Sequence, residues 1–488
     1  MKPVLVPILL AGVALGANMP KVGPNDEPPK AAAPDSYHQQ TVAAGTNGGA
    51  AARDWWATLG DPGLTDLIDR AVRANLDLKI ASSRVLEARS ARRVTRADLL
   101  PSITSSDNIQ RVRGGLTQGL FNAKGPSGGS SLLAPFETSV YQFGFDSSWE
   151  IDFFGGRRRA LEAATADVAA IEEARHDALV TLLAEVARNY AELRGFQKRL
   201  ELTRQNIALQ QDSLDLTRVR ADAGLGTQLD VERQSAQLDS TRALVPQLET
   251  AEVQTIHRLS VLLGEEPGAL LAELTERKPL PTVPPAVPVG LPADLLKRRP
   301  DIREAEARVA AETARVGVAR ADLFPKILLT GAAGRQGTEP SALTLGAGNF
   351  FSFGPAITLP IFTSGKIRAN IEAQKQRLDQ ALTQYQSAVL NSLEETENAL
   401  VAYGHEKDRR ERLVAAVEAS RQATTLSGEL YTRGLSDFLS VLDAQRQQLA
   451  AEDDLAQSDT AVVTNLVALY KALGGGWEGV SQESASQR

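Results

Sequence analysis

The segment Val94-Thr-Arg-Ala-Asp-Leu-Leu-Pro101 returns later in this 488-residue chain as Val318-Ala-Arg-Ala-Asp-Leu-Phe-Pro325, an offset of 224 residues. Further along, an offset of 210 holds without gaps from Phe143, which matches Phe353, to Gly264, which matches Gly474. A fixed offset over such a length indicates that one structural unit is used twice.

A Pro-rich segment separates the two copies of the repeat. We predict a first repeat over residues 61–278, a Pro-rich connector over 279–292 and a second repeat over 293–477. An N-terminal extended segment over 17–60 and a flexible C-terminal tail over 478–488 flank them. The first copy carries 14 additional residues between Pro101 and Phe143, and the high Gly content of this segment indicates a longer loop.

Residues 1–16 have the character of a signal peptide. A run of about 15 uncharged residues follows Lys2, too short to span a bilayer and suited to the apolar part of an export signal. Ala14-Leu15-Gly16 provides a small-residue cleavage site. No later segment has the pattern of a transmembrane helix, so we expect any membrane insertion to use strands.

Each copy is predicted to contain a helix, a strand pair, a very long helix, a tight turn and a last helix. The predicted helices run from Pro62 to Asp98, Arg157 to Ala223, 228 to Leu263, Ala293 to Asp322, Lys366 to Arg433 and Ser436 to Leu473. Asp61 is the expected N-cap of the first, with Pro62 as its first residue. A helix of 67 residues would be about 100 Å long at ~1.5 Å per residue. The two shorter helices of a copy together nearly match it, so they could stack end to end beside it.

The predicted strands alternate between apolar and polar residues. In the first copy the odd positions include Tyr141, Phe143, Phe145 and Trp149, and the even positions are polar or Gly. Phe351 and Phe353 repeat the pattern in the second copy. Such alternation is typical of a transmembrane β-barrel with a wet interior, although a half-buried strand of a soluble sheet would show it too. We favour the barrel and expect these six aromatic residues to face lipid.

Four strands are too few to close a barrel, for which about eight is the working minimum. Open edges in hydrocarbon would leave backbone groups without partners. The chain is therefore expected to oligomerise, and the residues alone permit a dimer, a trimer or a tetramer.

The composition excludes several other classes of protein. The net charge is −7 with mixed signs, so we expect no nucleic-acid partner. The chain has no Cys, and its four His residues show no metal-ligand spacing. It contains no phosphate-binding loop, dinucleotide fingerprint or nucleophile elbow. We expect no enzyme activity, no catalytic residues, no metal and no cofactor.

Several motifs resemble those of TolC-like outer-membrane factors, especially the NodT-type branch that works with resistance-nodulation-division pumps. They occur in the expected order: Leu295-Leu-Lys-Arg-Arg-Pro-Asp-Ile-Arg-Glu-Ala-Glu306, Ala319-Arg-Ala-Asp-Leu-Phe-Pro325, Pro355-Ala-Ile-Thr-Leu-Pro-Ile-Phe362, Leu439-Ser-Val-Leu-Asp-Ala-Gln445 and Leu469-Tyr-Lys-Ala-Leu-Gly-Gly-Gly-Trp477. The resemblance implies a mainly α fold with a transmembrane β part: a homotrimer with a 12-stranded β-barrel in the outer membrane and a 12-helix α-barrel tunnel in the periplasm. It also implies a periplasmic adaptor and an inner-membrane pump as partners, and an exit duct for drugs or other small toxic compounds.

One position departs from the family pattern. Many members of this branch carry a lipid-modified Cys after Leu-Ala-Gly, whereas here Leu10-Ala11-Gly12 is followed by Val13. Lipid anchoring is therefore not assumed.

In the family, the turns between the long and the last helices form a constricted periplasmic entrance. The matching turns are Ala223-Gly-Leu-Gly-Thr-Gln-Leu-Asp-Val231 and Arg433-Gly-Leu-Ser-Asp-Phe-Leu-Ser-Val441. The resemblance implies a gate lined by the following residues: Asp437, Asp230, Phe438, Leu435 and Leu225. A symmetric ring of carboxylates would attract cations and repel itself; the alternative for both Asp residues is helix capping. Gly224 and Gly434 suit the turn itself and the docking of an adaptor hairpin.

Two other readings remain open. A periplasmic adaptor also contains long helical hairpins, but it would need compact domains of short strands at regular spacing. A structural coiled-coil protein would not require the alternation between Tyr141 and Phe153.

Overall fold

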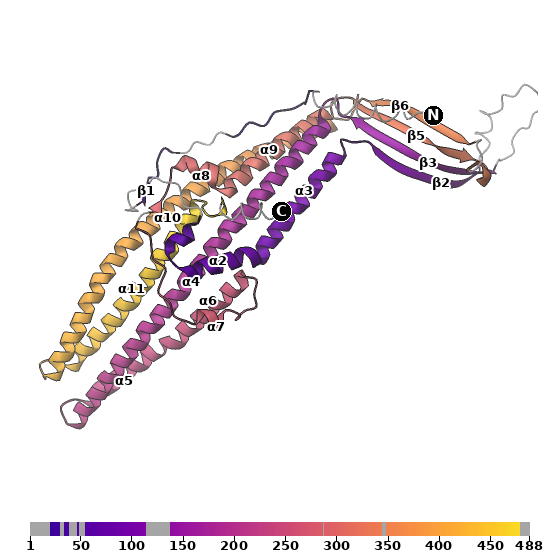
Figure 1. The fold of residues 1–488 in the computed structure, drawn as a ribbon. Coiled ribbons are helices and arrows are strands. Elements are labelled where there is room, and N and C mark those ends of the chain that lie inside the picture. Colours follow the sequence, from indigo (N-terminus) through magenta and orange to yellow (C-terminus); the bar gives the residue numbers. More distant parts are fainter. Residues whose placement is uncertain are drawn as a thin grey trace, which may run out of the picture. The chain divides into compact units, whose positions relative to one another are not determined.

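The computed structural model describes residues 20–29, 34–38, 46–47, 54–113, 137–285, 287–343 and 348–478. The predicted signal peptide and residues 479–488 of the predicted tail lie outside this range. The main elements, shown in Figure 1, are α2 (Pro62–Ala74), α3 (Leu76–Ala97), β2 (Ser102–Arg113), β3 (Glu137–Ile151), α4 (Gly156–Asp222), α5 (Gln228–Arg242), α6 (Leu244–Leu262), α8 (Pro292–Arg298), α9 (Pro300–Ala321), β5 (Lys326–Gly337), β6 (Asn349–Thr358), α10 (Lys366–Thr432) and α11 (Phe438–Ala472). The short elements are β1 (Thr46–Asn47), η1 (Trp55–Leu59), α7 (Leu271–Leu274), β4 (Val287–Pro288) and η2 (Pro340–Leu343).

The chain forms two compact units, which are described separately. The strand unit contains the sheet and the adjoining helix ends, and comprises the described residues of Met1–Pro28, Glu87–Val168 and Ala307–Leu382. The helical unit comprises the described residues of Pro29–Leu86, Ala169–Glu306 and Thr383–Arg488.

The internal repeat is present in the secondary structure almost residue for residue. The long helices α4 and α10 each have 67 residues, and both their ends are offset by 210. α3 and α9 each have 22 residues, and β2 and β5 each have 12, all offset by 224. Among the described residues, no helix is both long and apolar enough to cross a bilayer.

Three predicted helices are interrupted, and the prediction of continuous helices there was wrong. The first breaks at Asn75, whose ψ of 133° is extended. The Asn75 side chain donates from Nδ2 to the Leu262 carbonyl (2.9 Å) and accepts from the Leu78 N–H (2.9 Å). Arg299 makes the repeat-equivalent break between α8 and α9, and its Nη1 donates to the carbonyl of Ala472 (2.9 Å). In each copy, the side chain at the break therefore caps the end of the returning helix.

The third interruption separates α5 from α6 at Ala243. Pro246 has no N–H to donate to the carbonyl of Arg242, so one helical hydrogen bond is missing there. The second copy has Ala456 at the equivalent position, and α11 is continuous. The break at Asn75 depends on a tertiary hydrogen bond that no local sequence pattern indicates. The break at Ala243, in contrast, is indicated locally by Pro246.

The sheet is antiparallel throughout, in the order β2-β3-β5-β6. Residues opposite one another share a face. In each of the three strand pairings, odd-numbered residues lie opposite odd-numbered residues, so all odd-numbered residues share one face of the sheet. Most of the large apolar side chains lie on this odd face: Ile103, Ile109, Tyr141, Phe143, Phe145, Trp149, Ile151, Ile327, Leu329, Phe351, Phe353 and Ile357. The even face is mainly polar or small: Thr104, Ser106, Asn108, Gln110, Gln142, Asp146, Ser148, Glu150, Thr330, Gln336 and Ser352.

The helical unit has one large apolar core to which both copies contribute. Trp55 stacks on Tyr470 with ring centroids 5.1 Å apart, and both are buried. The predicted N-cap Asp61 is confirmed, because its carboxylate accepts from the N–H groups of Gly63 (2.8 Å) and Leu64 (3.2 Å). Tyr190 Oη also donates to Asp61 (2.7 Å), which connects the start of α2 to α4.

We expect Asn75→Ala to lower the free energy of unfolding, because the buried Leu262 carbonyl and Leu78 N–H would lose their partner. Unpaired buried groups cost roughly 1–3 kcal/mol each. Thermal unfolding of the detergent-solubilised protein, followed by circular dichroism, would measure the loss. Asp69→Ala, at an exposed position of α2, is the control and should leave the transition unchanged; equal effects would contradict the capping role.

Candidate functional site

The two turns that the sequence singled out lie at the same end of the helical unit and have the same backbone geometry (Figure 1). Gly224 (φ 72°) and Gly434 (φ 73°) are both in the left-handed region, which favours glycine. In the first turn, the N–H of Leu225 donates to the Arg220 carbonyl (2.8 Å) and that of Gly224 to the Ala221 carbonyl (3.0 Å). The second turn repeats both bonds 210 residues later. Each long helix therefore ends in a Schellman motif.

The two Asp residues at the turns cap the helices that follow, from different positions. Thr227 is the N-cap of α5, and Asp230 completes its capping box by accepting from the Thr227 N–H (3.3 Å) and hydroxyl (2.7 Å). Asp437 is itself the N-cap of α11 and accepts from the Ser440 hydroxyl (2.6 Å) and N–H (3.1 Å). Both bonds lower the pKa of Asp437, and the bond from the Ser440 hydroxyl is the larger cause. Asp437 is exposed, whereas Asp230 is largely covered.

The apolar residues of the predicted gate differ in exposure. Leu225 (68%) and Leu435 (72%) are well exposed at the turns. Phe438 is only 2% exposed, since it packs edge-to-face against Tyr431 with ring centroids 5.4 Å apart. In the chain described, Phe438 thus stabilises the turn from inside and does not line its surface.

Each of the two helical hairpins has its own small apolar cluster near the turn. The α4–α5 hairpin buries Leu214, Val231 and Leu238. The α10–α11 hairpin buries Tyr431, Phe438, Val441 and Leu442. Near the tips, each hairpin is therefore stabilised mainly from within.

Polar contacts join the two hairpins to each other. Arg199 forms a bidentate pair with Asp453 (2.6 and 3.1 Å), and Asn206 Nδ2 donates to Glu452 (2.8 Å). Closest to the tips, Arg220 Nη1 donates to the Thr432 carbonyl (3.1 Å), and its guanidinium lies 4.7 Å from the centre of the Tyr431 ring. The sequence did not predict this role of Arg220, because the sequence pattern of a helix does not show which of its faces meets a neighbouring helix.

The six aromatic residues predicted to face lipid all lie on the odd face of the sheet. Four are exposed: Phe143, Phe145, Phe351 and Phe353. Tyr141 is half-buried, and so is Trp149, whose indole Nε1 donates to the Leu99 carbonyl (3.0 Å) in the turn between α3 and β2. Trp149 therefore also ties strand β3 to the end of α3.

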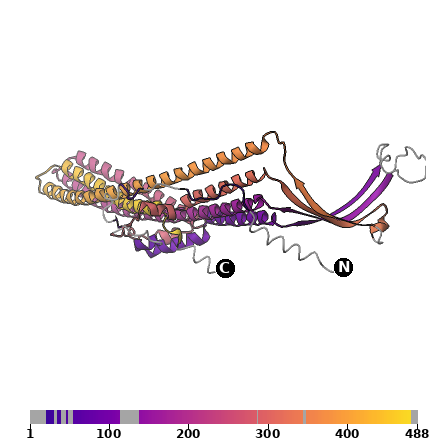
Figure 2. The same ribbon diagram turned by 90° about the horizontal axis from the view of Figure 1, so that it is seen from above.

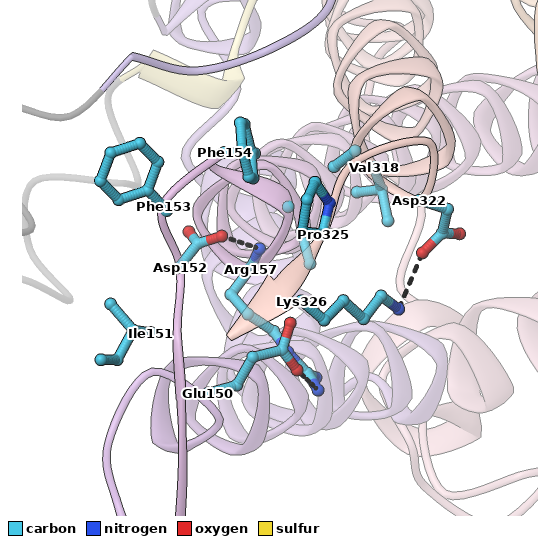
Figure 3. A pocket seen from close by; sticks show the side chains of 13 residues that line it. Glu150, Ile151, Asp152, Phe153, Phe154, Arg157, Val318, Asp322, Pro325 and Lys326 are labelled. Atoms are coloured by element: carbon cyan, nitrogen blue, oxygen red, sulfur yellow. Dashed lines mark hydrogen bonds and ion pairs between the residues drawn. The ribbon is translucent and has the colours of Figure 1, made fainter. Parts of the chain in front are cut away.

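A cavity of about 210 Å³ lies in the strand unit where the sheet meets the helices (Figure 3). Its charged side chains are engaged with each other: Glu150 with Arg157 (2.7 Å), and Asp322 with Lys326 (2.9 Å). The Asp152 carboxylate accepts from the Arg157 N–H (3.0 Å) at the start of α4. The cavity is thus part of the strand-to-helix joint, and its chemistry does not suggest a ligand. No group of three His, Asp or Glu residues within the described ranges could hold a metal ion.

Comparison with known proteins agrees with this architecture. The family model of outer membrane efflux proteins matches residues 67–265 and 291–475. Nodulation protein T of Rhizobium leguminosarum bv. trifolii is 30% identical over 463 residues, 94% of this chain and 95% of that protein. The solvent efflux pump outer membrane protein SrpC of Pseudomonas putida is 33% identical over 426 residues, 86% of this chain and 87% of that protein. The solved outer-membrane channel OprN aligns with a TM-score of 0.87 at 37% identity, covering 94% of this chain and 99% of that chain. The chain belongs to the outer membrane efflux protein family.

Proposed function

We propose that this chain forms a homotrimeric exit duct whose sheet lies in outer-membrane lipid and whose helices extend into the periplasm. The duct receives its cargo from a periplasmic adaptor and an inner-membrane pump of the resistance-nodulation-division type. It passes that cargo passively to the outside, as expected of the outer-membrane component of a tripartite efflux system. The relative named for solvent efflux supports small apolar compounds as one class of cargo.

The two-sided sheet is the observation that carries this proposal. The charged residues of the odd face lie level with Phe143 or beyond it, toward the loops: Asp107, Arg111, Arg113, Glu137 and Arg335. Between Phe143 and Ile151 the odd face carries no charge. That stretch measures roughly 27 Å along the strand at about 3.4 Å per residue, or about 20 Å in height at a tilt of about 40°, against an apolar band of about 25 Å in outer-membrane barrels. The polar even face then lines a water-filled passage.

The open edges of the sheet support assembly from several copies. β2 and β6 each pair on one side only within the described chain. In lipid such edges would leave N–H and C=O groups unpaired, at several kcal/mol each. Three copies supply the twelve strands that the resemblance implies.

The turn residues are proposed to form the periplasmic gate. Leu225, Leu435 and Asp437 are exposed at the turns and would meet their symmetry mates near the axis. Asp230 caps α5 behind them, and Phe438 supports the second turn. Gly224 and Gly434 have open space around their α-carbons, which suits close approach of an adaptor hairpin. The polar contacts between the hairpins would hold the entrance closed.

A charge on the odd face should impair membrane insertion, whereas the same charge on the even face should not. Phe145→Lys places an ammonium group in hydrocarbon, at roughly 2–4 kcal/mol near the bilayer midplane. Gln142→Lys, three residues earlier on the other face, is the matched control. The measurement is the amount of each variant in the isolated outer membrane. Equal amounts of both variants in the outer membrane would contradict the assignment of the odd face to lipid.

Loss of the Arg220 contact should favour the open entrance. Arg220→Ala removes the bond to Thr432 and the contact with the Tyr431 ring. These are together worth about 1–2 kcal/mol, or roughly a 5- to 30-fold shift toward opening. Planar-bilayer recordings should show a higher resting conductance than for Arg218→Ala, which removes an exposed arginine two residues away. If the two variants conduct alike, Arg220 does not hold the gate.

The cation preference of the duct should persist in mild acid. Because Ser440 lowers the pKa of Asp437, the carboxylate stays charged above that depressed value and loses its charge only as the pH falls through it. Reversal potentials in a salt gradient should show cation preference down to about pH 4, near the ordinary pKa of Asp. In Ser440→Ala the cation preference should be lost at a higher pH, and in Asp437→Asn the cation preference should be weaker at every pH. A preference unchanged in Asp437→Asn would exclude Asp437 from the entrance.

A further inference from the structure

Residues 20–25, which precede the first repeat, are held in the strand unit by a buried arginine of α4. Arg159 donates from Nε to the Val22 carbonyl (3.2 Å) and from Nη2 to the Gly23 carbonyl (3.3 Å). The same Nη2 atom donates to Asn25 Oδ1 (2.9 Å). Arg159 is only 1% exposed, so water does not compete for these bonds. Hydrogen bonds from a charged donor are the stronger kind, and this side chain makes several to one short segment.

The segment also reaches the joint between the sheet and the helices. The Val22 N–H donates to the Phe154 carbonyl (3.1 Å), between β3 and α4. The Phe154 ring stacks on that of Phe324, between α9 and β5, with centroids 4.7 Å apart. Arg158 Nη2 donates to the Pro20 carbonyl (3.3 Å). Residues 20–25 therefore lie where the two central strands of the sheet join their helices.

Two glycines let the segment cross α9 at close range. Gly23 has a φ of 102°, in the left-handed region that favours glycine, and an added Cβ there would lie 2.5 Å from the Gly317 Cα. An added Cβ at Gly317 would in turn lie 3.0 Å from the Arg159 side chain. The segment, α9 and the arginine of α4 thus pack directly on one another.

The start of α4 is built for this contact, whereas the start of α10 is not. Residues 157–159 are all Arg, although the positive end of a helix dipole disfavours cations. The equivalent residues of α10 are Ile367, Arg368 and Ala369. Figure 2 shows the start of α10 separated from the other helices next to the sheet. The arginine that binds the segment therefore occurs in the copy that the segment precedes, and its counterpart in the other copy is alanine.

We propose that residues 20–25 are a strap that locks the central strands β3 and β5 to their helices. The seat of the strap consists of Arg159, Gly317 and the carbonyl of Phe154. Its ligand is an extended peptide, bound mainly through backbone carbonyls, with glycine where the peptide crosses α9. The strap is a feature of one chain, so it does not depend on the proposed trimer.

One carboxylate of the neighbouring residues opposes the binding of the strap. Glu162 pairs with Lys21 (3.4 Å) and with Arg159 (3.0 Å). Burial and, next, the negative charge of Glu162 raise the pKa of Asp26, just after the strap. Removal of the charge at Asp26 should therefore hold the strap more tightly.

Trypsin cleavage after Lys21 measures how often the strap leaves its seat, because a bound backbone must detach before a protease can cut it. The whole protein in detergent is treated with trypsin, and the new N-terminus at Val22 is quantified by mass spectrometry. Arg159→Ala should speed this cleavage roughly 10- to 100-fold, because buried charged hydrogen bonds are lost. Gly23→Ala should speed it too. It leaves α4 and α9 unchanged, and so decides the question if Arg159→Ala does not fold.

Matched variants separate the strap from general effects of substitution. Arg377→Ala removes an exposed arginine of α10 that donates to Gln374 (3.3 Å), and should leave the cleavage rate unchanged. Asp26→Asn should slow cleavage about two- to fivefold, whereas Glu27→Gln, at the exposed next position, should not. Equal cleavage rates in Gly23→Ala and in the unaltered chain would overturn the strap.

Hydrogen exchange shows whether the strap holds the central strands. Gly23→Ala should speed amide exchange several-fold at the joint ends of β3 and β5, residues 149–151 and 327–329. Residues 462–470 of α11, in the core of the helical unit, should exchange as before. Faster exchange in both regions would indicate a general loss of stability and contradict the lock. Unchanged exchange in the strands of a chain whose strap is released would contradict it as well.

Discussion

The two open edges of the four-stranded sheet are the constraint on which the rest of the structure depends. A sheet with one apolar and one polar face can separate lipid from water only if its edges are paired, because hydrocarbon offers no partner for free N–H and C=O groups. One chain supplies a wall segment, with β2 at one edge and β6 at the other. The exit duct that we propose is therefore assembled from several copies of this chain, which pair these edges.

The helical unit distributes its stability unevenly, in a way that suits a passage with a closable entrance. Trp55, Tyr190 and Tyr470 belong to a large core that holds both copies of the repeat together. Toward the turns, the apolar clusters lie within each hairpin. Charged or polar pairs such as Arg199–Asp453 join one hairpin to the other. Polar contacts can exchange with water at modest net cost, whereas an apolar core cannot be opened without exposing its area. Motion is therefore expected at the tips and rigidity in the core.

Much of the fold was predictable because the evidence for it is local or periodic. The 210-residue offset predicted two equal long helices, and the alternation around Phe143 predicted a two-sided sheet. The turn glycines and the capping by Asp61 also followed from local chemistry. Other features depend on residues far apart in the chain. The break at Asn75 is stabilised by the carbonyl of Leu262, and the burial of Phe438 needs Tyr431 beside it. Arg220 acquires its role only when the end of α10 lies next to that of α4.

The claim that the sheet separates lipid from a water-filled passage is tested most directly by labelling single cysteines along β3. The chain has no native Cys, so each position from 141 to 151 can be examined alone in outer membranes with a water-soluble maleimide. The account predicts labelling with a period of two: even-numbered positions such as Gln142 and Ser148 react, and odd-numbered positions such as Phe143 and Phe145 do not. Uniform labelling along the strand, or reaction at the odd-numbered positions instead, would contradict it.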